Sequence, residues 1–489
     1  MTEALAGRSV LVTGLGVSGA ASLRALVAEG ARVTVTDART DGPVLEAAAE
    51  AERLGARVLL GHPGRSHPGR STSGAGGLPA GTELVVTSPG WRPDDPLLLA
   101  AAAADVPVWG EVELAWRLRP ADAAPWLVLT GTNGKTTTVR MLESILRAAG
   151  RRAVACGNVG LPVVEAVRAG SGDGPAPPYD VLAVELSSFQ LHWTHSMRPA
   201  AAAALNVAPD HVDWHGSLEA YARDKGRIYR GAGVGVANAD DPRTVRLLHA
   251  SDVRRGAAFT LATPALGELG LVEDLLVDRA FVADPVAGAE ELATLADLTV
   301  TGRHNVANAL AAAALARAHG VPADAVRDGL RAFVPDPHRN ALVATLDGVA
   351  YVDDSKATNP HAAAASLSAY PSIVWVAGGL AKGAEYDDLV AGAARRLRGV
   401  VLIGRDRARI ADALARHAPQ VPVVEVPQTD TGAMPATVAH ARALARPGDT
   451  VLLAPAAASM DMFRDYTARG QAFAAAVAAL TARDPEGPA

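Results

Sequence analysis

Residues 126–138 read WLVLTGTNGKTTT, and in this stretch an apolar run passes directly into a glycine-rich turn. The run predicts a buried strand, and the turn predicts a phosphate-binding loop, because successive backbone N–H groups in such a turn form a nest for anions. Lys135 would reach the β- and γ-phosphates of a nucleotide, and the Thr136 hydroxyl would bind Mg²⁺. Leu129 occupies the position of the first glycine in the usual pattern, so the loop is a shortened form. We predict an ATP site formed by Gly131, Thr132, Asn133, Gly134, Lys135, Thr136 and Thr137.

Strands and helices alternate in both directions from this loop. Apolar runs such as SVLVTG, ELVVTS, SIVWVAGG and TVLLAPA are separated by stretches rich in Ala, Leu and Arg, an order typical of α/β domains with largely parallel sheets. Proline-rich breaks lie near 117–125 and 333–340, and a Gly-, Ser- and Pro-rich segment at 61–81 predicts a surface loop. We predict three α/β domains: a Rossmann-like domain (1–110), a central P-loop ATPase-like domain with a parallel sheet (111–335) and a C-terminal Rossmann-like domain (336–489).

The composition is typical of a soluble protein. The 489 residues carry a formal net charge of −6 and one cysteine. This charge balance and the lack of a basic stripe argue against a nucleic acid partner, and a single cysteine excludes an intramolecular disulfide. No stretch is long and apolar enough to cross a bilayer, and the first residues lack the pattern of a signal peptide. We expect a cytoplasmic monomer that binds neither nucleic acid nor membrane.

Lysine is rare in this chain. Only four of the 46 Lys and Arg residues are lysines, namely Lys135, Lys225, Lys356 and Lys382. A G+C-rich genome explains arginine at solvated positions, where the two residues are nearly equivalent. Lysine differs in being a compact charge and a primary amine whose pKa shifts readily on burial. We interpret the four lysines as candidate functional residues.

A second glycine-rich turn lies near the N-terminus. Gly14, Gly16 and Gly19 have G-x-G-x-x-G spacing between a predicted strand and helix, and Asp37 ends the next strand. This pattern is typical of a turn that holds a diphosphate at a helix N-terminus, and any nucleoside diphosphate can use it. Taken alone it also permits a nicotinamide-dependent dehydrogenase, but that interpretation assigns no role to residues 131–137.

Two further strand ends in the central region carry chemical groups. Glu185 ends the strand VLAVE, and His211 follows the strand AALNVA. Ligands collect at the carboxyl ends of parallel strands, so both are candidate Mg²⁺ ligands, although Mg²⁺ prefers oxygen. Three other histidines stand in HxxH and WH contexts that offer no partner acid, and we interpret them as surface or capping residues: His192, His195 and His215.

The C-terminal region exposes basic and hydroxyl groups at several predicted strand ends. The segment DDSKATN follows one strand, AGGLAKG another and APAAASMDMF a third. Together such groups can hold a small dianion, a nucleotide or both. The candidates are Arg339, Asp354, Lys356, Thr358, Lys382, Ser459 and Tyr466.

The motifs together resemble a known family. GTNGKTT, GNVGLP, ELSSFQL, LNVAPDHVDWHGS, YARDKGRIY, GRHNVANALAA, PHR, DDSKATNP, AGGLAKG and LLAPAAASMDMF occur in this order, and they resemble the Mur ligase family over nearly the whole chain. ELSSFQL combined with VTGLGVSG is most similar to the members that add D-glutamate. A member that adds another amino acid and a folylpolyglutamate-type synthase stay open as alternatives, and the N-terminal glycine turn disfavours the latter.

The resemblance implies a cytoplasmic reaction of peptidoglycan precursor synthesis, with ATP and two Mg²⁺ ions. ATP would phosphorylate the carboxylate of UDP-N-acetylmuramoyl-L-alanine, and the amine of D-glutamate would attack the resulting acyl phosphate. The implied catalytic residues are Lys135, Glu185, His211, Lys225 and Arg339. The implied metal ligands are Thr136, Glu185, His211 and Lys225 as a carbamate.

The resemblance also assigns binding residues by position. ATP would be contacted, beyond its phosphate loop, by Asn305, Asn308, Arg339, Asp354 and Lys356. The UDP-linked substrate would be held by Gly14, Leu15, Gly16, Val17, Ser18, Gly19, Asp37, Arg39, Ser88, Pro89, Gly90, Asn158 and Ser187. D-Glutamate would lie among Thr358, Lys382, Ser459 and Tyr466.

Overall fold

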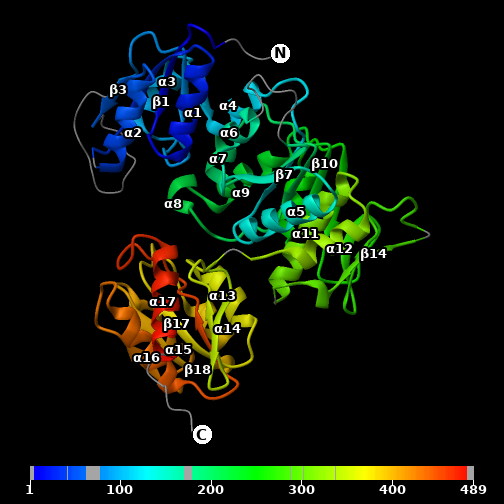
Figure 1. Ribbon diagram of the computed structural model, residues 1–489, viewed down its shortest axis with the longest axis vertical. Coiled ribbons are helices and arrows are strands. Elements are labelled where there is room, and N and C mark those ends of the chain that lie inside the picture. Colours follow the sequence, from blue (N-terminus) through cyan, green and yellow to red (C-terminus); the bar gives the residue numbers. More distant parts are fainter. Residues whose placement is uncertain are drawn as a thin grey trace. The chain divides into compact units, whose positions relative to one another are not determined.

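The computed structural model describes residues 5–40, 42–61, 77–169, 179–286, 288–300, 302–335 and 337–481. Contacts divide the chain into two compact units, each shown in Figure 1. The first unit comprises Met1–Leu298 with Ala307–Phe333, and the second comprises Thr299–Val306 with Val334–Ala489. Most of the Gly-, Ser- and Pro-rich segment at 61–81 lies outside the described residues.

The first sheet of the first unit is parallel throughout, with strand order β3-β2-β1-β4-β5. Its strands are β1 (Ser9–Thr13), β2 (Arg32–Asp37), β3 (Arg57–Leu60), β4 (Leu84–Thr87) and β5 (Val108–Gly110). The helices that follow them are α1 (Val17–Ala28), α2 (Gly42–Arg53), α3 (Pro96–Ala103) and α4 (Glu111–Leu118). The order reverses at β1, so the glycine turn after β1 lies at the point where ligands bind in doubly wound sheets.

The second sheet of this unit has the order β14-β13-β12-β11-β10-β9-β6-β8-β7, parallel from β7 to β12 and antiparallel at β13 and β14. Its strands are β6 (Trp126–Thr130), β7 (Ala153–Gly157), β8 (Val181–Glu185), β9 (Ala201–Ala204), β10 (Val234–Asn238), β11 (Arg255–Phe259), β12 (Glu268–Val272), β13 (Leu275–Asp278) and β14 (Glu290–Thr294). All five residues of β6 are buried, which agrees with the unbroken apolar run in its sequence.

The α-helices of this region range in length from four residues in α8 to sixteen in α11. They are α5 (Lys135–Ala148), α6 (Val163–Arg168), α7 (Ser188–His192), α8 (Val212–His215), α9 (Leu218–Gly226), α10 (Pro242–His249), α11 (Arg303–Ala318) and α12 (Ala323–Ala332), with short 3-10 helices η1 (Arg227–Tyr229) and η2 (Leu295–Asp297).

The second unit holds a six-stranded sheet with order β15-β16-β20-β17-β18-β19, in which only β15 is antiparallel. Its strands are β15 (Ala341–Leu346), β16 (Val349–Asp353), β17 (Ile373–Gly378), β18 (Leu397–Ile403), β19 (Val423–Glu425) and β20 (Thr450–Leu453). Its helices are α13 (Pro360–Ser368), α14 (Asp387–Ala393), η3 (Ala394–Arg396), α15 (Arg407–His417), α16 (Ala433–Leu444) and α17 (Tyr466–Thr481).

Strand β17 shows how this sheet is buried on both faces. Ile373 and Trp375 pack in the cluster that contains α13, α14 and α15, whereas Val374 and Val376 pack in the cluster that contains α16 and α17. Successive side chains of a strand point to opposite faces, so helices on both sides require a continuous apolar strand. The predicted α/β fold class is confirmed by the three parallel-rich sheets. No helix among the described residues is long and apolar enough to cross a membrane.

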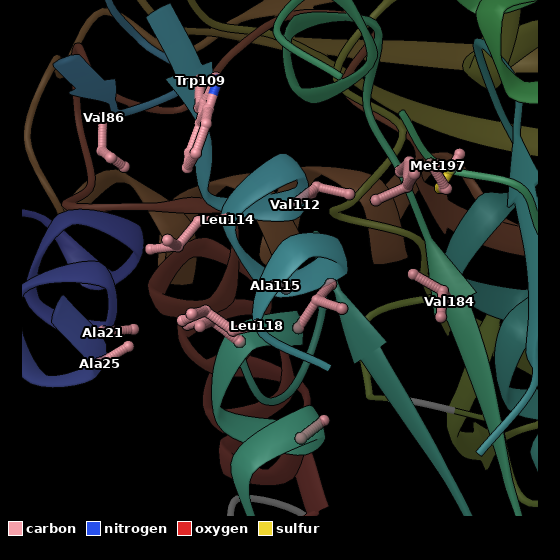
Figure 2. Packing of buried hydrophobic residues seen from close by; sticks show 14 of the residues in the cluster. Ala21, Ala25, Val86, Trp109, Val112, Leu114, Ala115, Leu118, Val184 and Met197 are labelled. Carbon is pink, nitrogen blue, oxygen red and sulfur yellow. The ribbon is translucent and has the colours of Figure 1, made fainter. Parts of the chain in front are cut away.

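Helix α4 joins the two sheets of the first unit. Figure 2 shows Leu114 and Leu118 directed toward Ala21 and Ala25 of α1, while Val112 lies on the side of Met197 and β8. These residues belong to one buried cluster that includes strands of both sheets. The glycine turn and the phosphate loop are therefore held by one continuous core.

Candidate active site

Hydrogen bonds hold the phosphate loop to the ends of β8 and β9, the two strands that pair with β6. The Thr130 hydroxyl donates to the Leu186 carbonyl (2.7 Å), just after β8. The Thr132 N–H donates to the Asn206 carbonyl (3.0 Å), and the Asn133 N–H donates to Asn206 Oδ1 (2.9 Å), just after β9. The loop therefore has a defined conformation before any anion binds, which lowers the entropic cost of binding.

Gly134 closes the loop at the first turn of α5. Its φ of 81° favours glycine, and an added Cβ would lie 2.4 Å from Asn308 Oδ1, so that the Asn308 side chain would have to shift. Lys135 follows, and its Nζ donates to the carbonyls of Gly131 (2.8 Å) and Thr132 (3.0 Å). The ammonium group thus lies within the loop, where it can neutralise phosphate charge.

Glu185 connects the loop to the GNVG segment. Glu185 Oε2 accepts from the Thr136 hydroxyl (2.9 Å), and Oε1 accepts from Asn158 Nδ2 (2.8 Å). The Asn158 N–H also donates to the Glu185 carbonyl (2.8 Å), and the Glu185 side chain is buried. The structure therefore brings the predicted residues Thr136, Glu185 and Asn158 into direct contact, while Ser187 caps α7 through the Gln190 N–H (3.2 Å).

Lys225 reaches the underside of the same loop. The residue is 1% exposed, its Nζ donates to the Gly131 carbonyl (2.8 Å), and it lies 4.7 Å from the centre of the Tyr221 ring. Burial, reinforced by the nearby charge of Lys135, holds the pKa of the Lys225 amine well below its usual range. The neutral amine is the form that reacts as a nucleophile.

His211 lies at the start of α8 in a left-handed conformation with a φ of 51°. Its Nε2 is 3.6 Å from Asp210 Oδ2, and burial lowers the pKa of the imidazole, so the neutral ring can offer a lone pair. No group of three or more His, Cys, Asp or Glu residues within the described ranges is arranged to hold a metal ion. The contact between Thr136 and Glu185 does supply the oxygen donors that Mg²⁺ prefers.

The N-terminal glycine turn is closely packed on one side and open on the other. A Cβ on Gly19 would lie 1.8 Å from the Gly14 carbonyl oxygen, and one on Gly14 would lie 2.8 Å from Ser88 Oγ. By contrast, an added Cβ on Gly16 or Gly90 would meet nothing within 4 Å. The turn therefore leaves its Gly16 side accessible to a ligand.

Asp37 organises this turn. Its Oδ2 accepts from the Leu15 N–H (2.8 Å) and from Arg39 Nη2 (3.0 Å), and its Oδ1 accepts from the Arg39 N–H (2.9 Å). Burial alone would raise the pKa of Asp37, but these bonds outweigh it and lower the pKa. Asp37 is therefore an ionised group that holds Leu15 and Arg39 at the edge of the turn, while Val17 stays 74% exposed.

In the second unit, the segment DDSKATN is connected to its surroundings through backbone and side chain. The Asn340 N–H donates to Asp354 Oδ1 (3.2 Å), and the Lys356 N–H donates to the His338 carbonyl (3.2 Å). Arg339 lies between His338 and Asn340, the two residues that these bonds hold in place. Burial raises the pKa of Asp354 to about 6. Lys356 Nζ lies 3.9 Å from the centre of the Tyr466 ring, so a predicted ATP residue and a predicted D-glutamate residue touch.

Arg469 is a buried residue of this unit that the sequence did not single out. It donates to the Ser355 hydroxyl (3.0 Å), the Ser355 carbonyl (2.8 Å) and the Ala457 carbonyl (3.1 Å). Leu380 and Ala458 exchange two backbone hydrogen bonds. These bonds join the segments that carry Thr358, Lys382 and Ser459.

Backbone strain concentrates in the predicted motifs. Eight non-glycine residues of the described ranges have positive φ, and five of them lie in or beside the motifs: His211, His338, Asn340, Lys382 and Ala456. Left-handed backbone is costly for residues with a Cβ, and it clusters at functional sites where the surrounding structure enforces it.

The interpretation of His192 and His215 as histidines without a partner acid is wrong. Both donate from Nδ1 to Asp224 Oδ2, at 2.8 and 2.9 Å, and the His215 side chain is fully buried. His195 is exposed, and its backbone N–H donates to Glu113 Oε2 (2.7 Å). The acids lie 9 to 82 residues away along the chain, so no local pattern could have indicated these pairs.

Comparison with known proteins identifies family matches and similar relatives. Residues 129–316 match the family model described as Mur ligase middle domain, and residues 338–457 match Mur ligase, glutamate ligase domain. The chain is 61% identical over 480 residues to the UDP-N-acetylmuramoylalanine--D-glutamate ligase of Streptomyces avermitilis, covering 97% of this chain and 99% of the relative. It is also 61% identical over 478 residues to the enzyme of the same name from Thermobifida fusca, with 97% and 99% covered.

A solved structure shares the fold. The UDP-N-acetylmuramate-alanine ligase of Thermotoga maritima aligns with a TM-score of 0.55 over 97% of this chain and 99% of its own, at 19% identity. The two family models cover the phosphate-loop region and the region of DDSKATN, and the curated relatives align along nearly the whole length. The chain belongs to the Mur ligase family.

Proposed function

We propose that this chain forms the amide bond between UDP-N-acetylmuramoyl-L-alanine and D-glutamate, with conversion of ATP to ADP and phosphate, in cytoplasmic peptidoglycan precursor synthesis. The observation that carries the proposal is the 61% identity, over 97% of the chain, to ligases named for this reaction. Two observations argue against the nicotinamide-dependent alternative. The chain belongs to the Mur ligase family, and the alternative leaves the phosphate loop without a role. We further propose that the enzyme acts as a monomer.

We propose a separate binding role for each of the three regions predicted from the sequence. Residues 1–110 would bind the UDP-linked substrate, residues 111–335 would bind ATP, and residues 336–489 would contribute to ATP and D-glutamate binding. The open Gly16 side of the N-terminal turn supports diphosphate binding there. Basic and hydroxyl groups joined through Arg469 and the Leu380–Ala458 bridge support a small dicarboxylate in the second unit.

Phosphoryl transfer to the substrate carboxylate depends on positioning and charge neutralisation more than on covalent help from the protein. The N–H groups of residues 131–134 and the Lys135 ammonium would hold the β- and γ-phosphates. Thr136 and Glu185 would hold one Mg²⁺, and His211 with a carbamate on Lys225 would hold a second. When bound, the ions neutralise and orient the phosphate oxygens.

Lys225 is suited to carbamylation by its environment. A neutral amine adds to CO₂ and releases one proton, which yields an N-carboxylate, and the lowered pKa of Lys225 favours the neutral amine that this addition needs. A guanidinium cannot carry this group, so Lys225→Arg should lose at least about 100-fold in kcat. Labelling with ¹³CO₂ and NMR should show a carbamate signal in the parent enzyme that the variant lacks. Ordinary activity of Lys225→Arg would remove the carbamate from the mechanism.

The decisive experiment for the reaction is phosphate release with ATP, Mg²⁺, UDP-N-acetylmuramoyl-L-alanine and a panel of amino acids. We expect D-glutamate to give far more phosphate than L-glutamate, L-lysine or D-alanine, together with a product of matching mass. If D-glutamate gives no more phosphate than the others, the assignment is wrong. A different preferred amino acid would identify a Mur-type ligase of another specificity.

A further inference from the structure

Three short helices of the first unit meet at one carboxylate. Asp224 lies near the end of α9, and its Oδ2 accepts from Nδ1 of His192 at the end of α7 (2.8 Å) and from Nδ1 of His215 at the end of α8 (2.9 Å). Its Oδ1 forms an ion pair with Arg227 Nε (3.0 Å), and Arg227 Nη1 donates to the His192 carbonyl (2.6 Å). Helices α7, α8 and α9 are thus linked through Oδ2 of a single side chain, and Oδ1 adds a further link to α7 through Arg227.

Asp224 is charged despite its burial. The residue is 6% exposed, and burial by itself would raise its pKa, yet the bonds from His192 and His215 outweigh burial and bring the pKa well below its usual range. A buried carboxylate with this many partners is costly to disturb, because removing one partner leaves the others without compensation. We call Asp224, His192, His215 and Arg227 the Asp224 hub.

The hub continues to the motif that carries Glu185. Because His215 donates from Nδ1 to Asp224, its Nε2 accepts from the Ser188 hydroxyl (3.0 Å). This Ser–His–Asp connectivity resembles that of hydrolytic triads. Ser188 is only 2% exposed, however, so its hydroxyl is out of reach of a substrate. The chain of hydrogen bonds therefore serves to tether α7 to α9.

The hub also reaches two further candidate metal-binding residues, Lys225 and His211. Lys225 directly follows Asp224 and points to the Gly131 carbonyl. Phe189 stacks on the His215 ring (centroids 5.5 Å apart, 5° between planes) and contacts the His211 ring (4.7 Å). Lys225 thus adjoins the hub along the chain, and His211 is connected to it through the Phe189 ring.

We propose that Asp224 is a positioning residue: it locks α7, α8 and α9 together and thereby holds Lys225 beneath the phosphate loop and His211 beside it. The functional consequence rests on the roles of Lys225 and His211 in the proposed function. Asp224 itself has both oxygens engaged by His192, His215 and Arg227, so it acts through its neighbours rather than on the substrate.

The first test is chemical labelling of lysine, which needs no turnover. The chain has only four lysines, so mass spectrometry can assign each acylation site after treatment with an amine-specific reagent. In Asp224→Asn we expect Lys225 to react roughly tenfold faster than in the parent, because loss of the charge loosens α9 locally. The exposed Lys382 in the second unit is the internal reference and should react at an unchanged rate.

Glu113→Gln is the matched control. Glu113 is another buried acid of the first unit, and it accepts from the N–H groups of His195 (2.7 Å) and Ser196 (2.8 Å) and from the Ser196 hydroxyl (2.6 Å). It has no bond to α9. This variant should lose thermal stability as Asp224→Asn does, but should leave Lys225 labelling and kcat per folded molecule unchanged.

The second test separates positioning from stability. With enzyme concentration corrected for the folded fraction, Asp224→Asn should lower kcat by roughly 10- to 100-fold, while KM for the UDP-linked substrate changes less than about threefold. His215→Phe keeps the ring stack on Phe189 but removes both hydrogen bonds of His215. It should show the same fall in kcat with little change in KM. This second variant serves if Asp224→Asn fails to fold.

The outcomes are distinct for the two proposals. If the parent enzyme does not turn over with D-glutamate, the proposed function fails, but faster Lys225 labelling in Asp224→Asn would still support the positioning role. If Lys225 labelling and kcat per folded molecule in Asp224→Asn and His215→Phe equal those of Glu113→Gln, the hub only stabilises the fold and the positioning proposal is wrong.

Discussion

Glu111 and Glu113 are both buried on α4, yet their carboxyl groups are shifted in opposite directions. Burial raises the pKa of Glu111 to about 7 and outweighs the bond that its Oε1 accepts from the Val164 backbone N–H (2.6 Å), while its Oε2 has no hydrogen-bond partner among the described residues. Burial opposes ionisation of Glu113 as well, but the bonds from Ser196, His195 and Arg117 outweigh it and lower the pKa. Local hydrogen bonding thus determines which of two like residues is charged.

This contrast predicts opposite responses to pH. The unfolded chain ionises Glu111 near pH 4.5, whereas the folded chain keeps the proton to about pH 7, so this residue's contribution to folding stability falls as pH rises through that window. Glu111→Gln should therefore gain up to about 3 kcal/mol in the free energy of unfolding at pH 8 and much less at pH 5. Urea denaturation at the two pH values measures the difference.

Glu113→Gln supplies the opposite sign in the same experiment. Because the folded pKa of Glu113 is depressed, its stabilising contribution is present above its ordinary pKa and is lost as pH falls. This variant should be less stable than the parent at pH 8, by about 1–3 kcal/mol. Equal responses of the two variants to pH would contradict the assigned protonation states.

At the scale of elements, the contact between β1 and α1 depends on one glycine. Gly19 lies in the first turn of α1, where an added Cβ would lie 1.8 Å from the Gly14 carbonyl oxygen. Gly16 at the N-cap has ordinary φ (−74°) and no atom within 4 Å of an added Cβ. Gly19 therefore allows α1 to pack closely on β1, whereas Gly16 leaves room for a ligand.

Two alanine substitutions test this distinction. Gly19→Ala must push α1 away from β1, so it should cost about 3 kcal/mol or more in the free energy of unfolding and weaken binding of a UDP-sugar. Gly16→Ala should cost only about 1 kcal/mol, the usual penalty for alanine at an N-cap, yet it should also weaken that binding. Urea denaturation and titration calorimetry measure the two effects. A Gly16→Ala variant with unchanged UDP-sugar affinity would show that the diphosphate does not approach this turn.

At the scale of the whole molecule, the two compact units carry different parts of the proposed chemistry. The phosphate loop, Glu185 and Lys225 belong to the first unit, whereas Asp354, Lys382 and Ser459 belong to the second. Six of the seven tryptophans also lie in the first unit, and only Trp375 lies in the second. Tryptophan fluorescence therefore reports mainly on the unit with the phosphate loop.

This distribution predicts how nucleotide affects unfolding. ATP with Mg²⁺ at about 100 times its Kd should stabilise the first unit by about 2.7 kcal/mol and raise the midpoint of its fluorescence-detected transition by several degrees. Lys135→Ala should abolish the shift without lowering the midpoint measured in the absence of nucleotide by more than a few degrees. A shift of equal size in Lys135→Ala would place the nucleotide elsewhere.

Much of the fold could be predicted because its signals are local. The apolar run of residues 126–130 forms the buried strand β6, and the turn after it contains the left-handed Gly134. The contact of Thr136 with Glu185 follows from parallel strands whose carboxyl ends share an edge. The acid partners of His192 and His215 could not be predicted, because Asp224 is brought to them only by the packing of α9 against α7.

The four lysines show the same division. By itself, the sequence determined the α/β class and the phosphate loop with Lys135, because hydrophobic periodicity and glycine spacing act over a few residues. The tertiary structure decided that the Lys225 amine is buried and that Lys356 lies on the Tyr466 ring. It also decided that the Asp224 carboxylate is charged and that Arg469 is a buried residue that connects separate segments. Burial and hydrogen bonding between residues distant in sequence set these properties, and they exist only once the chain has folded.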